Sequence, residues 1–203
     1  MRYDKGRKDA SRSRIMEVAS HRFRGDGIAA SGLASIMSDA GMTNGAFYPH
    51  FQSKADLVRE SMASALEIQS QQLQQALASG GLELAMAMYL SPEHRDHPEI
   101  GCASAALLPE IARQPPETRA LYTEKLLTLV HQLAKDLPPH TRDPESVALG
   151  VFAALIGALQ MARAVEGTEL SDRILAAGAD AARALTQPQQ KKHPRAAGEQ
   201  PSP

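Results

Sequence analysis

The stretch from Ile15 to Leu57 reads IMEVASHRFRGDGIAASGLASIMSDAGMTNGAFYPHFQSKADL and determines how the amino-terminal part of the chain folds. Its apolar residues recur at the spacing of short amphipathic helices. Glycines separate these patterns and predict tight turns between them. We therefore expect three helices and the start of a fourth, and the centre, Ser31–Phe51, has the organisation of a helix-turn-helix.

The first helix is expected to begin near Asp9 or Ser11, because either side chain can cap a helix amino terminus. It is expected to end at Gly25–Gly27, since glycine suits the left-handed geometry that terminates helices. Residues 1–8 are expected to form a flexible basic arm.

Caps and turns also set the bounds of the following helices. Ser31 is expected to cap the second helix, and residues 39–41 to form the turn after it. Thr43 is expected to cap a short third helix that ends by His50. Residues 53–56, Ser-Lys-Ala-Asp, resemble a capping box with Asp in place of Glu, which predicts the start of a long fourth helix.

Many residues of this segment match a known DNA-binding unit in unbroken register. The segment resembles the DNA-binding domain of the TetR family of bacterial transcriptional regulators. This resemblance implies that the third helix enters the major groove of DNA. The matching residues are Ala19, Phe23, Gly27, Ile36, Ala40, Gly41, Thr43, Gly45, Phe47, Tyr48, His50, Phe51, Ser53, Lys54 and Leu57.

The third helix exposes few bulky groups, which suits close approach to base edges. Asn44 can pair with adenine through two hydrogen bonds, and Lys54 at a helix amino terminus favours phosphate. The resemblance implies phosphate contacts for Tyr48 and His50. Each of these side chains also has a local alternative, such as capping or simple solvation. The expected DNA contacts are Thr43, Asn44, Gly45, Ala46, Tyr48, His50, Lys54 and Ser31.

Composition favours a soluble helical protein. Of the 203 residues, 43% are hydrophobic and 22% charged, Trp is absent, and helix formers are frequent. The single cysteine, Cys102, excludes an intramolecular disulfide, so we expect a cytoplasmic protein. The longest apolar run, 147–159, falls short of the ~20 residues that span a bilayer, so no membrane association is expected.

Charge is distributed unevenly along the chain. Residues 1–24 carry eight basic and three acidic side chains, whereas residues 61–187 carry nine basic and fifteen acidic ones. A basic segment beside a helix-turn-helix indicates phosphate contact, although a solvated charge run is the alternative.

The whole chain is expected to be all-α, with about nine helices. Residues 1–8 form the arm, 9–60 the DNA-binding domain, 61–187 a ligand-binding and dimerisation domain, and 188–203 a disordered tail. Ser91–Glu99 is expected to be a polar loop. The other expected helices of the third region are 82–90, 103–113, 117–137, 144–165 and 171–185, and Gly80–Gly81 closes the helix before them.

The segment VALGVFAALIGALQMA, residues 147–162, is apolar nearly all round a helix. Such a helix must be covered on every side, and a second subunit is the simplest cover for its outer face. A central core helix of a monomer is the alternative. The predicted homodimer interface consists of Val151, Ala154, Leu155, Ala158, Ala177 and Ala181.

The helices of residues 61–187 are also expected to enclose a site for a small apolar or amphipathic ligand. Methionines suit an adaptable site, although a methionine at helical spacing is more often plain core. The predicted lining consists of Met62, Leu66, Met86, Tyr89, Leu108, Tyr122, Phe152 and Ile156.

These features together predict a dimeric transcriptional repressor that a ligand releases from a pseudo-palindromic double-stranded operator. An activator of the same fold and a ligand-independent DNA-binding or adaptor protein remain alternatives. No cofactor, metal or catalytic residue is expected. His94, His97 and Cys102 suggest a metal or thiol sensor only weakly, and an enzyme using these histidines or His131 with Glu110 lacks a supporting motif.

Overall fold

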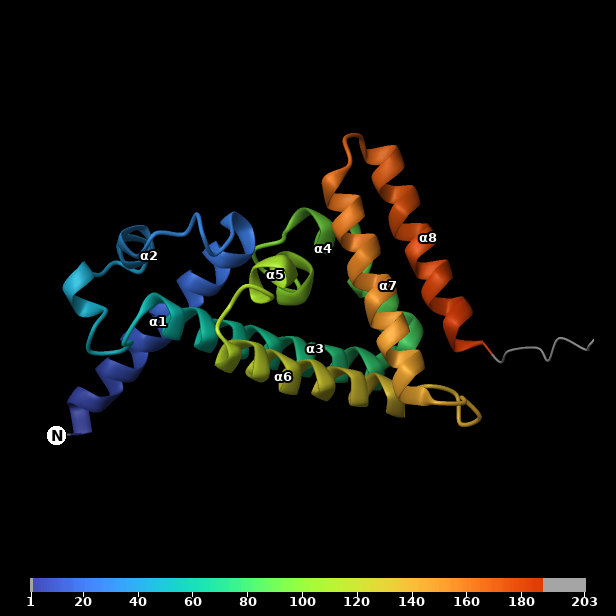
Figure 1. Cartoon of the computed structure of the whole chain (residues 1–203), viewed down its shortest axis with the longest axis horizontal. Coiled ribbons are helices and arrows are strands. Elements are labelled where there is room, and N and C mark those ends of the chain that lie inside the picture. The colour runs from blue at the N-terminus through green and yellow to red at the C-terminus, as the bar shows by residue number, and fades with distance from the viewer. Residues whose placement is uncertain (1, 188–203) are drawn as a thin grey trace, which may run out of the picture.

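The computed structural model describes residues 2–187, and over this range the chain is all-helical, as expected (Figure 1). The helices α1 (Arg2–Asp26), α2 (Leu33–Asp39) and the single 3-10 turn η1 (Asn44–Ala46), with the first turns of α3, form what we call the head. The rest of the described chain is the body. The predicted disordered tail, 188–203, lies outside the described residues.

The first helix is longer than the sequence indicates. It begins at Arg2 rather than near Asp9 or Ser11, so the segment predicted as an arm continues the helix. Residues 2–8 contain one helix-weakening residue, Gly6, and otherwise include several good helix formers, so nothing in them stops α1.

Two caps in the head differ from prediction. Gly32, not Ser31, occupies the amino-terminal cap of α2, and the Ser31 hydroxyl instead donates to the Gly27 carbonyl at 2.7 Å. The expected third helix is only η1 followed by turns up to His50. Thr43 occupies the amino-terminal cap position of η1, as expected, but its side chain makes no cap bond. Pro49 lacks the N–H that an α-helix would need at that position, which explains the short element.

The helix α3 spans Lys54–Tyr89 and begins with the predicted capping box. The Ser53 hydroxyl accepts from the Asp56 amide at 3.1 Å, and the Asp56 carboxylate accepts from the Gln52 amide at 3.2 Å. The helix bends at the predicted glycine pair, where Gly81 has φ +63°. The two limbs of α3 therefore point in different directions and leave space between them.

The remaining helices are α4 (Pro92–Asp96), α5 (Ala103–Ile111), α6 (Pro116–Lys135), α7 (Pro144–Ala164) and α8 (Thr168–Thr186). The helix α4 corrects the predicted polar loop: the Ser91 hydroxyl caps it by accepting from the His94 amide at 3.1 Å, and Pro92 occupies its first position. Figure 1 shows α6 beside α3, and α7 with α8 as a hairpin at the end away from the head.

Within residues 2–187, α7 is the one helix long and apolar enough to cross a membrane by length and composition. Its Val151 and Leu159 are completely buried inside the body, where α7 packs against α6 and α8. Its apolar character is therefore explained in part by its place in the core.

Candidate DNA-binding surface and ligand pocket

A small aromatic core holds the head together. The rings of Phe47 and Phe51 stack with centroids 5.4 Å apart, and both are buried together with Phe23, Ile36 and Leu57. Their burial makes these five residues core rather than contact residues. The η1 segment is therefore anchored from one side, which leaves its other side free.

The free side of η1 carries small or polar groups. Thr43, Asn44 and Gly45 are exposed, and Tyr48 is 69% exposed although it is a large aromatic residue. A Cβ atom on Gly45 would meet nothing within 4 Å among the described residues. Internal packing therefore does not require a glycine there. We call Thr43, Asn44, Gly45 and Tyr48 the η1 surface.

The other expected DNA contacts are less available. Ser31 is 0% exposed, so its side chain belongs to the core and is removed from the expected contacts. The Lys54 ammonium donates to the Ile28 carbonyl at 2.6 Å and connects α3 to the turn before α2.

Two further expected contacts are partly covered by the head itself. Ala46 is half-buried. His50 is half-buried, its Nδ1 atom is buried without a partner in the described structure, and burial together with Lys8 and Arg12 lowers its pKa.

Two polar contacts, which the sequence analysis missed, join the head to the body. The Glu110 carboxylate on α5 accepts from the amides of Ile28 and Ala29, both at 3.1 Å. The Arg24 guanidinium on α1 donates to the Gly101 carbonyl at 2.7 Å. No local motif marks either residue, because both contacts depend on how α5 packs against α1.

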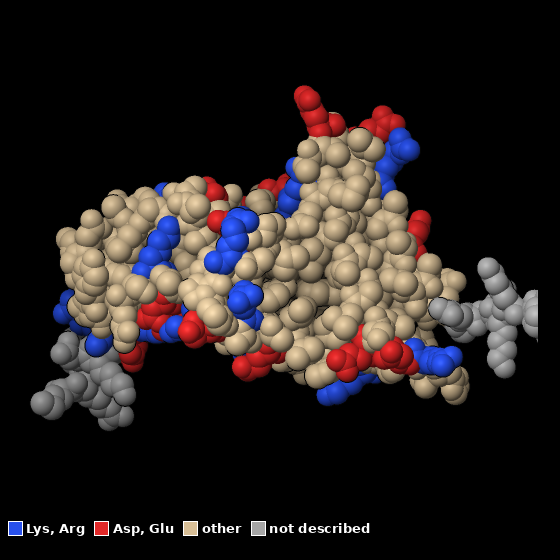
Figure 2. All heavy atoms as spheres, viewed as in Figure 1, with Lys and Arg blue, Asp and Glu red and all other residues tan. Residues whose placement is uncertain are grey.

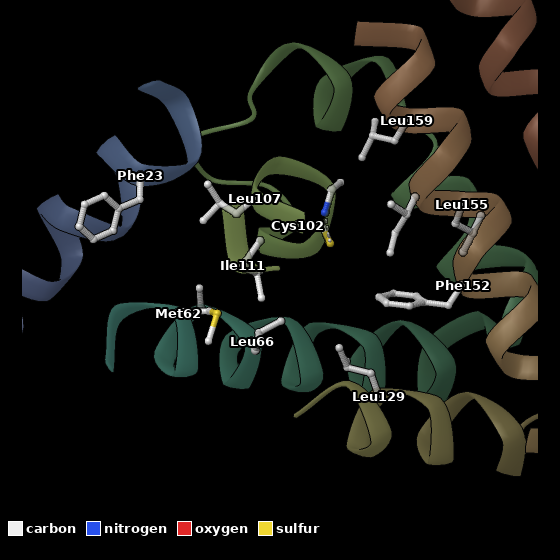
Figure 3. Packing of buried hydrophobic residues seen from close by; sticks show 14 of the residues in the cluster. Phe23, Met62, Leu66, Cys102, Leu107, Ile111, Leu129, Phe152, Leu155 and Leu159 are labelled. Carbon is white, nitrogen blue, oxygen red and sulfur yellow. Dashed lines mark hydrogen bonds between the residues drawn. The ribbon is translucent and has the colours of Figure 1, made fainter. Parts of the chain in front are cut away.

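The body contains a pocket of about 930 Å³ between the two limbs of α3, the segment 91–102, α6 and α7. Figure 3 shows Cys102, Leu129, Phe152 and Leu155 converging on this region from three different parts of the chain. Of the eight predicted lining residues, the pocket includes Met86, Tyr89 and Phe152.

The other five predicted lining residues lie elsewhere. Met62 and Leu66 are core residues on the first limb of α3, and Ile156 is buried away from the pocket. Leu108 is 36% exposed, and the Tyr122 hydroxyl donates to the Ser104 hydroxyl at 3.1 Å outside the pocket. Apolar type alone did not distinguish pocket wall from core.

Polar residues form a part of the wall that was not predicted. Gln69, Gln72 and Gln75 lie three residues apart on α3 and all face the pocket. The Gln-rich segment 69–75 was visible in the sequence, and its helical spacing was the available signal. His94 and Cys102 also line the pocket, together with the α6 residues Leu129 and Leu133.

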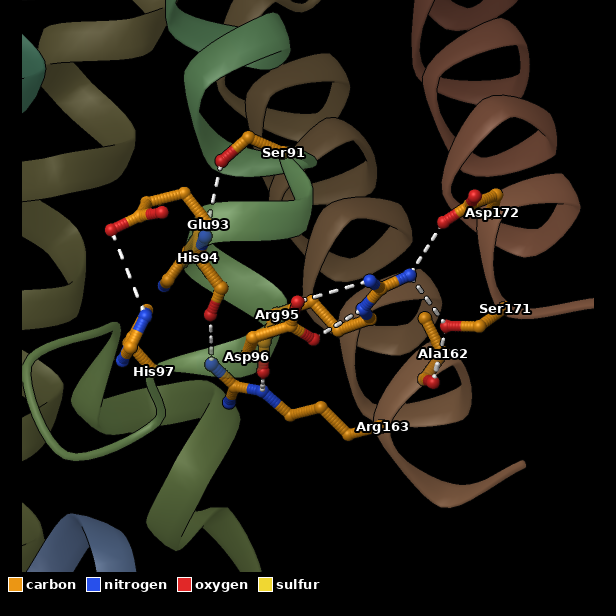
Figure 4. A network of polar contacts seen from close by, with 10 residues as sticks. All are labelled: Ser91, Glu93, His94, Arg95, Asp96, His97, Ala162, Arg163, Ser171 and Asp172. Carbon is orange, nitrogen blue, oxygen red and sulfur yellow. Dashed lines mark hydrogen bonds and ion pairs between the residues drawn. The ribbon is translucent and has the colours of Figure 1, made fainter. Parts of the chain in front are cut away.

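The segment expected to be a loose loop is held by several hydrogen bonds. His94 Nδ1 donates to the Tyr89 carbonyl at 2.6 Å, and its Nε2 accepts from the Cys102 amide at 2.8 Å. Arg163 of α7 donates to the carbonyls of His94 and Arg95 at 2.6 and 3.0 Å (Figure 4). The segment therefore forms a firm wall between the pocket, the head and α7.

A model of the family described as bacterial regulatory proteins, tetR family, matches residues 15–61, which include the whole η1 surface. Residues 15–61 are therefore similar to the amino-terminal DNA-binding domain of the TetR family. The chain is 39% identical over 67 residues to the HTH-type transcriptional regulator TtgR of Pseudomonas putida, which is 33% of this chain and 32% of that protein. The match thus spans about a third of that relative's length.

Solved structures extend the likeness to the fold of the body. The TetR-family regulator from Cytophaga hutchinsonii has a TM-score of 0.74 at 18% identity, over 90% of this chain and 98% of that one. The reduced form of E. coli NemR has a TM-score of 0.69 at 18% identity, over 83% and 95%. Head and body together therefore have the fold of these TetR-family regulators.

The predicted dimer face needs correction in this TetR-family fold. Val151, Leu155 and Ala158 are buried inside the single subunit, because α8 and the pocket wall cover that side of α7. A Cβ atom on Gly178 would lie 2.2 Å from the Ala158 Cβ, which shows how closely the two helices approach. The predicted residues left at the surface are the half-buried Ala154 and the exposed Ala177 and Ala181.

The basic residues of the TetR-family head are partly engaged in holding it together. Arg12 pairs with Glu60 of α3 and lies over the Phe51 ring, and Arg22 pairs with Asp39 of α2. On the face seen in Figure 2, acidic side chains gather along the lower edge of the body. The unequal charge of head and body seen in the sequence is therefore partly neutralised within the head.

Proposed function

We propose that this chain is a dimeric transcriptional repressor that binds a pseudo-palindromic DNA operator and releases it when a small molecule enters the body. The observation that carries the proposal is the η1 surface, exposed and poor in bulky side chains yet anchored by a buried aromatic core. It gives a rigid element that can approach base edges in a major groove. Because such an operator lies on the chromosome, the proposal also locates the protein in the cytoplasm.

The pocket favours a ligand-controlled regulator over a DNA-binding or adaptor protein without a ligand. A body that served only for dimerisation would be expected to be packed solid. This body instead contains a pocket of about 930 Å³ lined by residues of several helices. Glu110 and Arg24 connect the same body to the head. A ligand that binds more tightly to the arrangement of these contacts that disfavours DNA lowers the operator affinity. The size of this decrease is set by the difference between the ligand's affinities for the two arrangements.

The dimer is supported by the outer faces of α7 and α8. Leu149, Met161, Leu170 and Leu185 are large apolar residues that these helices leave exposed in one subunit. Large apolar residues gathered on the exposed faces of two neighbouring helices are typical of a protein interface. A two-fold dimer presents two η1 surfaces to successive major grooves, which is why the operator is expected to be pseudo-palindromic.

Selection of bound DNA from a random pool, followed by affinity measurements on the selected site, tests the proposal. A two-fold symmetric consensus is expected, and Asn44→Ala is expected to relax the base preference at one position of each half-site, costing about 1–3 kcal/mol there. Thr128→Ala, an exposed change on α6, is the control and should leave the consensus unaltered. Failure to enrich any sequence above the starting pool contradicts the proposed function.

A further inference from the structure

We propose that the pocket binds an anionic amphiphile, a molecule with a carboxylate head group and an apolar body, with the carboxylate beside Arg24 and Gly101. This inference rests on the proposed function, since it names the chemical class of the ligand that the body senses. It is carried by a positive charge without an ion-pair partner at one end of a predominantly apolar pocket.

Arg24 is a cation in the pocket wall without a counter-ion. Its Nε donates to the Ser20 carbonyl at 3.1 Å and its Nη1 to the Gly101 carbonyl at 2.7 Å. No carboxylate of residues 2–187 lies within ion-pair distance of its guanidinium. Burial lowers the pKa of Arg24, which reflects the cost of holding this charge away from water. Two neutral carbonyls do not balance a guanidinium, whereas a ligand carboxylate does.

Two carboxylates of the neighbouring segment 91–102, Glu93 and Glu99, lie beside His97 rather than pairing with Arg24. Glu99 lies 3.2 Å from His97 Nδ1, and Glu93 lies 3.8 Å from His97 Nε2. Both glutamates are more than a third exposed, and neither forms an ion pair with Arg24, although the Glu99 charge acts to raise the pKa of Arg24. The position beside Arg24 is therefore not occupied by an acid of the protein.

A second guanidinium adds to the positive potential at the same end. Nη2 of Arg163 lies 3.1 Å from where a Cβ atom of Gly101 would stand, and Arg163 also bonds only to backbone carbonyls (Figure 4). Its Nη1 is buried and lacks a partner in the described structure. The amino terminus of α5 starts at the adjoining Cys102, and its dipole has the same sign.

The rest of the pocket suits an apolar body. Leu82, Leu129, Leu133 and Phe152 line it from α3, α6 and α7. The Tyr89 hydroxyl in the same wall is buried and has no hydrogen-bond partner among the described residues. The Tyr89 hydroxyl can donate a hydrogen bond, and a carboxylate oxygen of the ligand can accept it. Glu93 is the acidic residue among those that line the pocket, but its side chain is 81% exposed and lies 3.8 Å from His97 Nε2.

The position of Arg24 links the ligand to DNA binding. Arg24 belongs to α1, the first helix of the head, and its bond to Gly101 is one of the two polar joints between head and body. A carboxylate that takes the place of the Gly101 carbonyl loosens this joint. Binding of the anion and binding of the operator are therefore coupled through one side chain.

Calorimetric titration of the full chain with decanoate, decanol and decylammonium tests the ligand class, because the three probes share a tail and differ in charge. Decanoate is expected to bind at least about tenfold more tightly than either of the others. Arg24→Met keeps the length of the side chain and is expected to remove this preference without changing the affinity for decanol. Arg119→Met, an exposed change on α6, is the matched control and keeps the preference.

Arg24→Lys covers the case in which Arg24→Met does not fold, and it is expected to keep part of the preference because it keeps the charge. Equal binding of decanoate and decanol to the native protein overturns the proposal, as does an unchanged preference in a folded Arg24→Met variant. Operator binding measured on the same samples separates the two proposals. Binding of DNA without an anion preference contradicts only the ligand class, and an anion preference without operator binding contradicts only the proposed function.

Discussion

Two glycines of the head have different physical roles. Gly41 has φ +73°, where a side chain is strained, so Gly41→Ala is expected to lower the free energy of unfolding by about 1 kcal/mol. Gly45 has an ordinary φ and open space around it. Gly45→Ala is therefore expected to leave stability nearly unchanged, yet to weaken operator binding roughly tenfold because its methyl group enters the groove.

Urea denaturation and operator titration of both variants check this pair. Gly41→Ala serves as the control for a change that acts through folding. A Gly45→Ala protein that binds the operator as tightly as the native one contradicts the placement of η1 in the groove.

His94 makes stability depend on pH. Its neutral imidazole donates to the Tyr89 carbonyl and accepts from the Cys102 amide, so a second proton on Nε2 would face an N–H donor at 2.8 Å. Burial is the main cause of its lowered pKa, and the Arg163 charge adds to it. The unfolded chain thus binds a proton more readily, and stability is expected to be full above pH ~6.5 and to fall as the pH drops toward the folded pKa.

Thermal unfolding of native protein and His94→Gln between neutral and mildly acidic pH measures this dependence. His50 also has a lowered pKa and contributes in the same direction, so the difference between the two proteins isolates His94. Parallel pH curves for the two proteins would contradict the role of His94.

At the scale of the element, the approach of α7 and α8 depends on Gly178. A methyl group there would overlap the Ala158 Cβ, so Gly178→Ala is expected to lower the free energy of unfolding by about 1–3 kcal/mol. Gly6→Ala on α1 is the matched control, because it lies away from the proposed dimer face and its methyl group meets nothing within 4 Å of the described chain. Thermal unfolding distinguishes them, and an equal effect of both changes would contradict the close α7–α8 contact.

The sequence predicted elements where local chemistry determines them. Ser53 and Asp56 start α3, and Gly80–Gly81, which were expected to close that helix, interrupt it with non-helical dihedral angles, because capping bonds and glycine dihedrals are local properties. The α4 helix was missed although Ser91 and Pro92 form an ordinary helix start. The pocket lining was predicted in part only, since it depends on which faces of α3, α6 and α7 meet across the bend. Met62 and Gln69 lie on the same helix, yet only the polar residue faces the pocket.

At the scale of the whole molecule, the head and the pocket meet through the two ends of α5. Cys102 caps its amino terminus in the pocket wall, and Glu110 near its other end holds the amides of Ile28 and Ala29. In the proposed function, a rigid helix of nine residues would transmit a displacement at the pocket to the turn that precedes α2. This arrangement gives the body a direct mechanical route to the η1 surface.

The dimer is the remaining property of the whole molecule, and two exposed methionines offer a matched test of it. Met161 on α7 is 60% exposed and Met88 on α3 is 55% exposed, but only Met161 lies on the face expected to meet a second subunit. Met161→Glu is expected to weaken dimerisation by at least about tenfold, because association would bury an unpaired charge. Met88→Glu is expected to leave the dimer intact. Sedimentation at micromolar concentration measures both.

The same variant also tests how the dimer binds DNA. Since two η1 surfaces must act together on one operator, Met161→Glu should lose affinity for the full site while a single half-site is bound as before. A dimeric Met161→Glu protein would place the interface elsewhere.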